Sequence, residues 1–215
     1  MNEPISKIIN KKSFWKDNFY VNKFVLDPRP ETEGIIEEAI KIYKNNKTHF
    51  KILDIGTGSG AIAISLAREF ENAEIVAIDI SEDAIKVANK NIKDRNLDKR
   101  INLKKTTFEN IEDDFDLIVS NPPYLTQKEI KNLANEIKKF EPKIALFGGK
   151  DGLDFYRGFS KKINKNLRNG GYLILEIGVS QFSDCMEIFN HSGLKFIKKS
   201  QDLQKKDRIM VFSKI

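Results

Sequence analysis

Cysteine and histidine are scarce in this sequence. Its 215 residues include one cysteine, Cys185, and two histidines, His49 and His191. A single cysteine cannot form an internal disulfide, so a reducing compartment, the cytoplasm, is the expected location. The two histidines lie far apart and have no cysteine or carboxylate nearby at zinc-ligand spacing. We therefore predict neither a disulfide nor a structural metal site.

Long apolar runs are also missing. The apolar segment 61–67 ends at Arg68 and is too short to span a bilayer. Charged residues interrupt every apolar core that a signal peptide would need near the N-terminus. The net charge of +6, from 37 basic and 31 acidic residues, forms no long basic block. We expect a soluble protein with no membrane partner, and surface lysines explain the charge better than a nucleic-acid site does.

Apolar runs typical of buried strands alternate with helical periodicity from residue 50 onward. With 40% hydrophobic residues, the chain has the composition of one globular α/β domain. Alternation of strands and helices requires right-handed crossovers, and therefore a mainly parallel, doubly wound sheet. The last two runs have a turn and no helix between them, which predicts an antiparallel hairpin. The expected strands of this seven-stranded, Rossmann-like sheet are 50–55, 74–79, 101–105, 115–120, 172–179, 194–198 and 208–212.

The residues before this alternating region have a different pattern. Two aromatic runs, 13–15 and 19–21, flank the polar residues 16–18 and predict a small β-hairpin. We therefore divide the chain into an N-terminal hairpin segment, 1–26, and an α/β domain, 27–215. Near the C-terminal part of that domain, residues Tyr156 to Leu167 have helical spacing, and we expect this helix to stop at the Asn169-Gly170-Gly171 sequence.

A glycine-rich loop follows the first predicted strand. In Gly56-Thr57-Gly58-Ser59-Gly60, three glycines let the backbone pass close to a ligand where a side chain would collide. Asp79 ends the next strand about 20 residues later, the usual position of an acid that holds ribose hydroxyls. Because the glycine spacing also fits a dinucleotide fingerprint, a nicotinamide-dependent dehydrogenase stays open at this point.

The sequence Asn121-Pro122-Pro123-Tyr124 directly follows the buried run 115–120. It therefore lies at the carboxyl end of a strand, where open α/β sheets bind ligands. Two prolines fix the backbone and remove two donors, so the carbonyls and the Asn121 amide oxygen can accept hydrogen bonds from a planar NH₂ group. The ring of Tyr124 can stack on that group. The alternative is an ordinary Asn-Pro turn.

Three features favour S-adenosylmethionine over a dinucleotide. Asp54 lies two residues before the first glycine, where its carboxylate suits a cationic amino-acid group and would repel a pyrophosphate. The acceptors around Asn121 suit an amino group and offer nothing to a hydride donor. The terminal antiparallel pair also resembles the methyltransferase sheet. We expect S-adenosylmethionine as the cofactor and S-adenosylhomocysteine as its product.

Motifs of one known family occur over nearly the whole chain, at residues 14–15, 25–33, 53–60, 120–124, 141–142, 145–146, 151–153, 176–178, 202–203 and 207–208. By these motifs the sequence resembles the release-factor glutamine methyltransferase family (PrmC/HemK), which methylates the side-chain amide of a glutamine in peptide chain release factors. The Asn-Pro-Pro-Tyr motif is shared with adenine and guanine amino-methyltransferases, whereas the motif at residues 28–33 occurs in a much narrower group of proteins.

This resemblance implies roles for individual residues. Gly56 to Gly60 would line the methionine end of the cofactor, Asp79 the ribose and Phe108 the adenine, and Asn121 would touch both cofactor and substrate. Thr107 stands where the family often has an aspartate, which predicts a weaker or different adenine contact. The family also carries an N-terminal helical domain, and this sequence begins about where that domain would end. The implied partner is a release factor, with nucleic acid only indirectly involved through the translation machinery; we expect a monomer.

The catalytic hypothesis places Asn121, Pro122 and Tyr124 around the substrate amide. The Asn121 side-chain oxygen and the Pro122 carbonyl would accept its two N–H bonds while Tyr124 stacks on its plane. Arg29, Glu31 and Pro123 would complete the substrate site, with helix capping as the alternative role for Glu31. The alternative functions are an amino-methyltransferase acting on adenine or guanine in RNA or DNA and a binding module without turnover.

Overall fold

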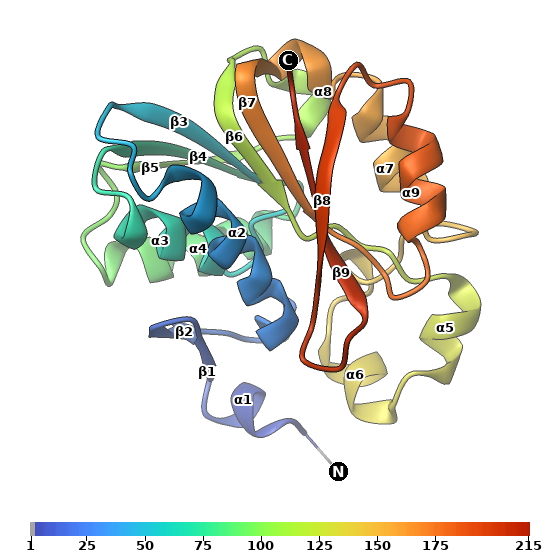
Figure 1. Cartoon of the computed structure of the whole chain (residues 1–215). Coiled ribbons are helices and arrows are strands. Elements are labelled where there is room, and N and C mark those ends of the chain that lie inside the picture. The colour runs from blue at the N-terminus through green and yellow to red at the C-terminus, as the bar shows by residue number, and fades with distance from the viewer. Residues whose placement is uncertain (1–2) are drawn as a thin grey trace.

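The computed structural model describes residues 3–215, so the first two residues of the predicted 1–26 segment lie outside the described residues. The small N-terminal hairpin and the larger sheet are both present (Figure 1). The elements in chain order are α1 (Ile5–Ile8), β1 (Lys11–Phe14), β2 (Asp17–Tyr20), η1 (Pro30–Thr32), α2 (Glu33–Tyr43), β3 (Phe50–Ile55), α3 (Ala61–Glu69), β4 (Ala73–Asp79), α4 (Glu82–Lys93), β5 (Ile101–Lys105), η2 (Phe108–Asn110), β6 (Phe115–Ser120), α5 (Gln127–Asn132), α6 (Asn135–Phe140), η3 (Lys143–Ala145), α7 (Asp154–Ser160), α8 (Ile163–Asn166), β7 (Leu167–Glu176), α9 (Phe182–Phe189), β8 (Lys195–Gln201) and β9 (Asp207–Ser213).

The seven strands of the main sheet have the order β5-β4-β3-β6-β7-β9-β8. Strands β3 to β7 pair in parallel, and β9 pairs antiparallel with both β7 and β8. This confirms the predicted doubly wound fold with a terminal antiparallel hairpin. The central strands are apolar along almost their whole length because helices cover both faces of the sheet.

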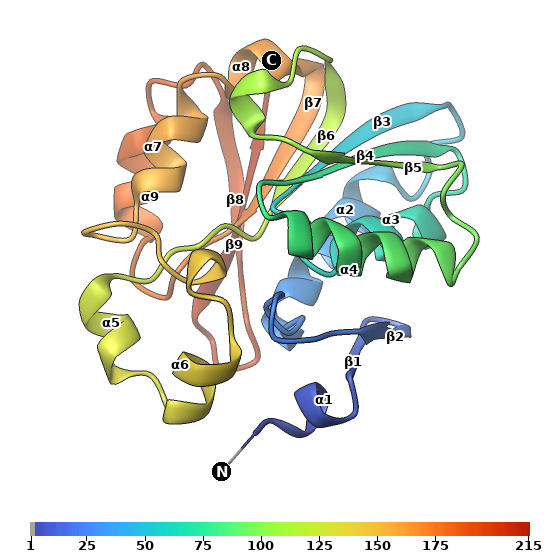
Figure 2. The same ribbon diagram turned by 180° about the vertical axis from the view of Figure 1, so that it is seen from behind.

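Two helical layers cover the sheet, as the opposite views in Figures 1 and 2 show. On one face, α2, α3 and α4 contribute buried residues such as Ile36, Ile64 and Val87 to a core cluster. On the other face, α7, α8 and α9 contribute a second cluster that includes Tyr156, Ile163 and the side chain of Cys185. The side chain of Cys185 is fully buried on an apolar helix face.

The N-terminal hairpin packs directly onto the first face. Phe14 and Phe19 are buried in the same cluster as α2 and α3. On α4, the amide of Asn91 donates to the carbonyl of Tyr20 at 2.9 Å and accepts from its N–H at 2.8 Å. The hairpin was predicted with a three-residue polar turn, and this detail is wrong. Phe14 pairs with Asp17, and Trp15 in the turn has φ of +53°.

The helix predicted over residues 156–167 is also wrong in its second half. Helix α7 ends at Ser160, α8 is a separate short helix, and Leu167 already belongs to β7, where it pairs with Phe115. The amide of Asn166 donates to the carbonyls of Ile111 and Asp113. The backbone is extended at Leu167, where the pairing with β6 begins, so a periodic apolar pattern alone misplaces the end of the helix.

The two motifs singled out in the sequence meet at the switch point of the sheet. The chain runs from β3 outward through β4 to β5 and then returns to β6 on the other side of β3. Ile55 at the end of β3 pairs with Ser120 at the end of β6. The glycine loop 56–60 and the turn 121–124 therefore leave adjacent strands at the same edge of the sheet, where α/β proteins bind ligands.

Candidate active site

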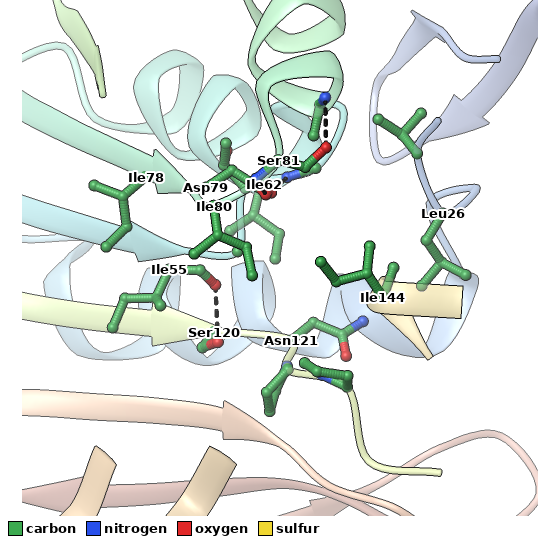
Figure 3. Close-up of a pocket in the computed structure, with 18 of the residues that line it drawn as sticks. Leu26, Ile55, Ile62, Ile78, Asp79, Ile80, Ser81, Ser120, Asn121 and Ile144 are labelled. Atoms are coloured by element: carbon green, nitrogen blue, oxygen red, sulfur yellow. Dashed lines mark hydrogen bonds between the residues drawn. The ribbon is translucent and has the colours of Figure 1, made fainter. Parts of the chain in front are cut away.

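A cavity of about 400 Å³ lies at this edge of the sheet. Figure 3 shows Leu26, Ile144 and Asn121 at one side of it, and Ile78, Asp79 and Ile80 at the other. The N-terminal segment and the segment after α6 therefore both contribute to its wall. Other lining residues come from the glycine loop, the start of α4, residues 106–109 and α7.

Backbone hydrogen bonds hold the glycine loop in place. The N–H groups of Gly56 and Thr57 both donate to the carbonyl of Ile78 at 2.9 Å. Gly56 and Gly58 have φ of +72° and +55°, a region that L side chains rarely adopt. A Cβ atom on Gly56 would meet nothing within 4 Å. The loop therefore leaves open space in front of its backbone, on the side of the cavity.

Asp54 lies behind this loop and is fully buried. Its Oδ2 accepts from the Thr57 hydroxyl at 2.7 Å and from the Ala63 N–H at 3.2 Å, whereas Oδ1 has no hydrogen-bond partner. Burial raises the pKa of this carboxyl to about 7. Asp54 is absent from the cavity lining, so direct contact with a cofactor stays a prediction. An unpartnered carboxylate oxygen beneath the loop is compatible with a cationic group above it.

Asp79 lines the cavity at the end of β4. Its Oδ2 accepts from the Gly58 N–H and its Oδ1 from the Ser81 N–H, both at 2.9 Å. Burial raises the pKa of Asp79, and backbone hydrogen bonds from Ser81, Gly58 and Ile80 oppose this shift. Each carboxylate oxygen can accept a second bond. The side chain is therefore fixed in orientation and retains two sites for hydroxyl groups of a ligand.

Phe108 forms an apolar part of the cavity wall. Its ring centroid lies 4.6 Å from that of Phe159 on α7, and the residue is 5% exposed. Thr107 lines the cavity beside it. An aromatic ring supported from behind can pack against a planar base.

Asn121 is held in one orientation by residues distant in the sequence. Just before it, the Ser120 hydroxyl donates to the Ile55 carbonyl at 2.8 Å, as the dashed line in Figure 3 shows. The Asn121 Nδ2 donates to Thr32 Oγ1 at 2.8 Å. The Thr32 hydroxyl in turn donates to Glu176 Oε2 at 2.6 Å. With its nitrogen engaged, Asn121 has its oxygen available as an acceptor.

Tyr124 is anchored to the same carboxylate. Its hydroxyl donates to Glu176 Oε1 at 3.2 Å. Burial raises the pKa of Glu176 to about 7 although Thr32, Arg208 and Tyr124 stabilise its charge. Burial also raises the pKa of Tyr124, with the Glu176 charge adding to the shift. The phenol therefore remains protonated, and its ring is fixed beside the Asn121 turn.

A second cavity, of about 300 Å³, adjoins the first. Tyr124 lines it together with residues of α5 and α6, the segment 178–181 and Arg208. The two cavities share five residues, Leu26, Arg29, Asn121, Pro122 and Ala145. The Asn121-Pro122 turn thus lies between two spaces, one beside the glycine loop and one beneath the α5–α6 segment.

Of the three other predicted substrate residues, Pro123 and Arg29 line a cavity and Glu31 does not. Pro123 lines the first cavity, and Arg29 lines both. The Arg29 guanidinium donates to Glu141 Oε1 at 3.3 Å. Glu31 lines neither cavity, and its charge raises the pKa of the nearby Glu176.

Neither Thr32 nor Glu176 was among the site residues predicted from the sequence. Both residues fall inside the sequences shared with the methyltransferase family, at 25–33 and 176–178. Their position in these shared sequences could have identified them as site residues, whereas the local sequence around either residue does not connect it with Asn121. Residues 3–215 contain no group of three or more acidic, histidine or cysteine side chains that could hold a metal ion. None of the helices in that range is long and apolar enough to cross a bilayer.

Residues 46–207 match a protein family described as a methyltransferase domain. A release factor glutamine methyltransferase from Clostridium acetobutylicum is 39% identical over 97% of this chain and 74% of its own length. A bifunctional methyltransferase from Rickettsia typhi is 41% identical over 99% of this chain, which spans 45% of that protein.

A solved structure gives a matching result. The release factor-specific protein-(glutamine-N5) methyltransferase of Alicyclobacillus acidocaldarius superposes with a TM-score of 0.54 at 27% identity. The match covers 87% of this chain and 93% of that one. The similarity therefore includes both the glycine-loop side and the Asn121 side of the fold.

Proposed function

The chain belongs to the family of release factor glutamine methyltransferases, and from that premise we propose that it methylates the side-chain amide nitrogen of a glutamine in a peptide chain release factor. The observation that carries the proposal is the position of Asn121. It lies between two adjoining cavities, and its amide nitrogen is bonded to Thr32. Its oxygen is left to accept an N–H bond from a carboxamide.

The first cavity fits S-adenosylmethionine, which supplies an activated methyl group when bound. The open space before Gly56 admits the methionine portion, and the unpartnered Asp54 Oδ1 lies behind that loop. Asp79 offers two free acceptor sites for ribose hydroxyls, and the supported ring of Phe108 offers a face for adenine.

The second cavity fits the glutamine side chain and its flanking residues. It is bounded by two apolar residues, Leu133 between α5 and α6 and Ile137 on α6, and by the Tyr124 ring. A substrate amide entering from this side reaches the Asn121 oxygen and the Pro122 carbonyl. We assign Arg29 to the rim of this site because it lines both cavities.

The residues of the turn overcome the weak nucleophilicity of an amide nitrogen chiefly by positioning it. Two fixed acceptors hold its N–H bonds, and the anchored Tyr124 ring supports its plane. Positioning of this kind can remove roughly 7–11 kcal/mol from a bimolecular barrier. As the nitrogen–carbon bond forms and positive charge grows on nitrogen, the same oxygens stabilise that charge. The proton that nitrogen loses is held at one of these oxygens before it passes to water.

The test is incubation of the protein with S-adenosylmethionine and a purified release factor, followed by mass spectrometry of its peptides. We expect one glutamine to gain the mass of one methyl group in place of hydrogen. A release factor with that glutamine replaced by alanine is the control. Methyl transfer to adenine or guanine in RNA, with none to the release factor, would contradict the proposal and support an amino-methyltransferase.

The proposed substrate belongs to the cytoplasm, where translation takes place. The buried Cys185 and the lack of another cysteine in the sequence fit that compartment.

A further inference from the structure

A chain of hydrogen bonds runs from the Asn121 turn into the protein, and Thr32, its middle member, also lines the first cavity. It passes from Asn121 Nδ2 to Thr32 Oγ1 at 2.8 Å and from the Thr32 hydroxyl to Glu176 Oε2 at 2.6 Å. Thr32 is 4% and Glu176 1% exposed. These residues come from the 3-10 helix before α2 and from the end of β7, so the fold brings three distant segments together.

The Glu176 carboxylate at the end of this chain decides the direction of each hydrogen bond in it. An ionised carboxylate can only accept, so Glu176 requires the Thr32 hydroxyl to donate toward it. The Thr32 oxygen then has only lone pairs to offer Asn121. Asn121 must place its NH₂ group there, because its carbonyl oxygen would face another acceptor. The amide oxygen is thereby directed away from Thr32, and Asn121 itself lines both cavities.

We propose that Thr32 and Glu176 are positioning residues for methyl transfer: the Glu176 carboxylate sets the direction of the Thr32 hydroxyl, which fixes Asn121 with its oxygen toward the substrate amide. This inference rests on the proposed function for the substrate it names. Glu176 contributes to the substrate site in a second way, because its other carboxylate oxygen accepts the hydrogen bond from the Tyr124 hydroxyl. One buried carboxylate thus orients both the acceptor and the stacking ring.

Protonation of Glu176 should loosen this arrangement. The groups that face its carboxyl are Thr32 and Glu31 from η1, Tyr124 from the turn and Arg208 from β9. Tyr156 on α7 donates to its backbone carbonyl at 3.0 Å. A protonated carboxyl becomes a donor, so the Thr32 hydroxyl is no longer compelled to point toward it. Turnover should therefore rise with pH as Glu176 ionises near neutral pH.

The first test compares turnover and cofactor binding in three variants of the hydrogen-bonded chain and in one control variant. Thr32→Val removes the hydroxyl at nearly equal volume and should lower kcat about tenfold or more with the cofactor Kd unchanged. Thr32→Ser keeps the hydroxyl and should restore most of the turnover. Glu176→Gln should also lower kcat, because its NH₂ group would donate to Thr32 and reverse the bond direction. Because glutamine does not ionise, Glu176→Gln should also abolish the increase of kcat with pH.

Ser200→Ala is the matched control. The Ser200 hydroxyl donates to the buried carboxylate of Glu38 at 2.8 Å, a bond of the same type with no link to Asn121. This variant should keep the wild-type kcat and pH profile. If Thr32→Val leaves kcat unchanged, or changes only the melting temperature, the two residues are structural and the inference is overturned.

A second measurement does not depend on the substrate. In a ¹⁵N-labelled sample, the side-chain NH₂ signals of Asn121 can be assigned by their loss in Asn121→Asp. We expect Thr32→Val to shift these signals strongly and Ser200→Ala to leave them in place. Unchanged Asn121 signals in Thr32→Val would overturn the inference. A wild-type protein that fails to methylate any release factor while Thr32→Val shifts these signals would instead reject the proposed function alone.

Discussion

The glycine-loop side of the site and the Asn121 side are assembled over very different distances in the sequence. Asp54 bonds to residues three and nine positions away, and the loop hydrogen bond from the Gly56 N–H to the Ile78 carbonyl spans 22 positions. On the other side, Asn121 bonds to Thr32 across 89 positions, and Thr32 to Glu176 across 144. The first side is a local motif, whereas the second exists only once the sheet has formed.

This difference suggests a division of labour. The local loop makes a binding surface that needs little beyond its own backbone. The Asn121 turn requires an acceptor fixed in one orientation, and distant buried residues supply that constraint. We therefore expect changes on the first side to affect cofactor affinity and changes on the second to affect turnover.

The largest expected effect comes from Asn121→Ala. Loss of the oriented acceptor should lower kcat by about 100- to 1000-fold, the range seen for removal of one preorganised group. The cofactor Kd should change by less than about threefold, because other residues make most of that site. Turnover assays with a release factor and calorimetry with cofactor give the two values. Equal losses in both would show that the two sides are not separable.

The pH dependence of the free energy of unfolding allows a further comparison of the two sides of the site. Each side contains one buried carboxyl group, Asp54 on the glycine-loop side and Glu176 on the Asn121 side. Burial raises the pKa values of Asp54 and Glu176 to about 7, well above those of an unfolded chain. Between about pH 4 and 7 the folded state therefore holds protons that the unfolded state has lost, and stability falls as pH rises. Each group should contribute about 2 kcal/mol of this loss between pH 5 and 7.

Denaturant unfolding of Asp54→Asn and Glu176→Gln at several pH values separates the two contributions. Each variant should flatten part of the pH dependence, and cofactor binding should alter only the part that Asp54 supplies. A wild-type stability that increases from pH 5 to pH 7 would contradict the burial of these two groups as neutral acids.

A smaller effect is expected from Asp79→Ala on the loop side. Removal of two acceptor sites for ribose hydroxyls should weaken cofactor binding about tenfold. At saturating cofactor, kcat should remain close to that of the wild type. Asp83→Ala, an acid in the first turn of α4 that lines neither cavity, is the control and should bind normally. A loss of kcat with unchanged affinity would reverse the proposed roles of the two sides.

The smallest effect is expected from Phe108→Leu. Leucine keeps most of the buried volume against Phe159 but removes the flat face, so adenine stacking worth about 1 kcal/mol should be lost. Cofactor affinity should fall about fivefold. Adenosine alone should bind more weakly by the same factor, which isothermal titration can measure. Unchanged adenosine affinity would remove Phe108 from the base site.

The sequence predicted the structure correctly where the residues of a single segment determine its local structure. The strands Phe50–Ile55, Ile101–Lys105 and Phe115–Ser120 agree with the prediction residue for residue. Phe50–Ile55 and Phe115–Ser120 are almost fully buried and therefore have a readable apolar run, whereas in Ile101–Lys105 burial is confined to Ile101. The glycine loop is visible because positive φ angles select glycine.

The prediction failed where distant partners decide the structure. Leu167 is extended and pairs with Phe115 on β6, although periodicity alone would have continued the helix to this residue. The role of Thr32 depends on Asn121 and Glu176, which no local pattern connects to it. Such contacts depend on strand order and register, which a single sequence specifies only through the complete fold.

The most direct test of the account is a crystal structure with S-adenosylhomocysteine and a release-factor peptide that contains the substrate glutamine. The account predicts that the glutamine side-chain nitrogen lies within hydrogen-bond distance of Asn121 Oδ1 and the Pro122 carbonyl, with Thr32 still bonded to Asn121 Nδ2. A peptide bound away from this turn, or an Asn121 amide that presents its nitrogen to the glutamine, would contradict it.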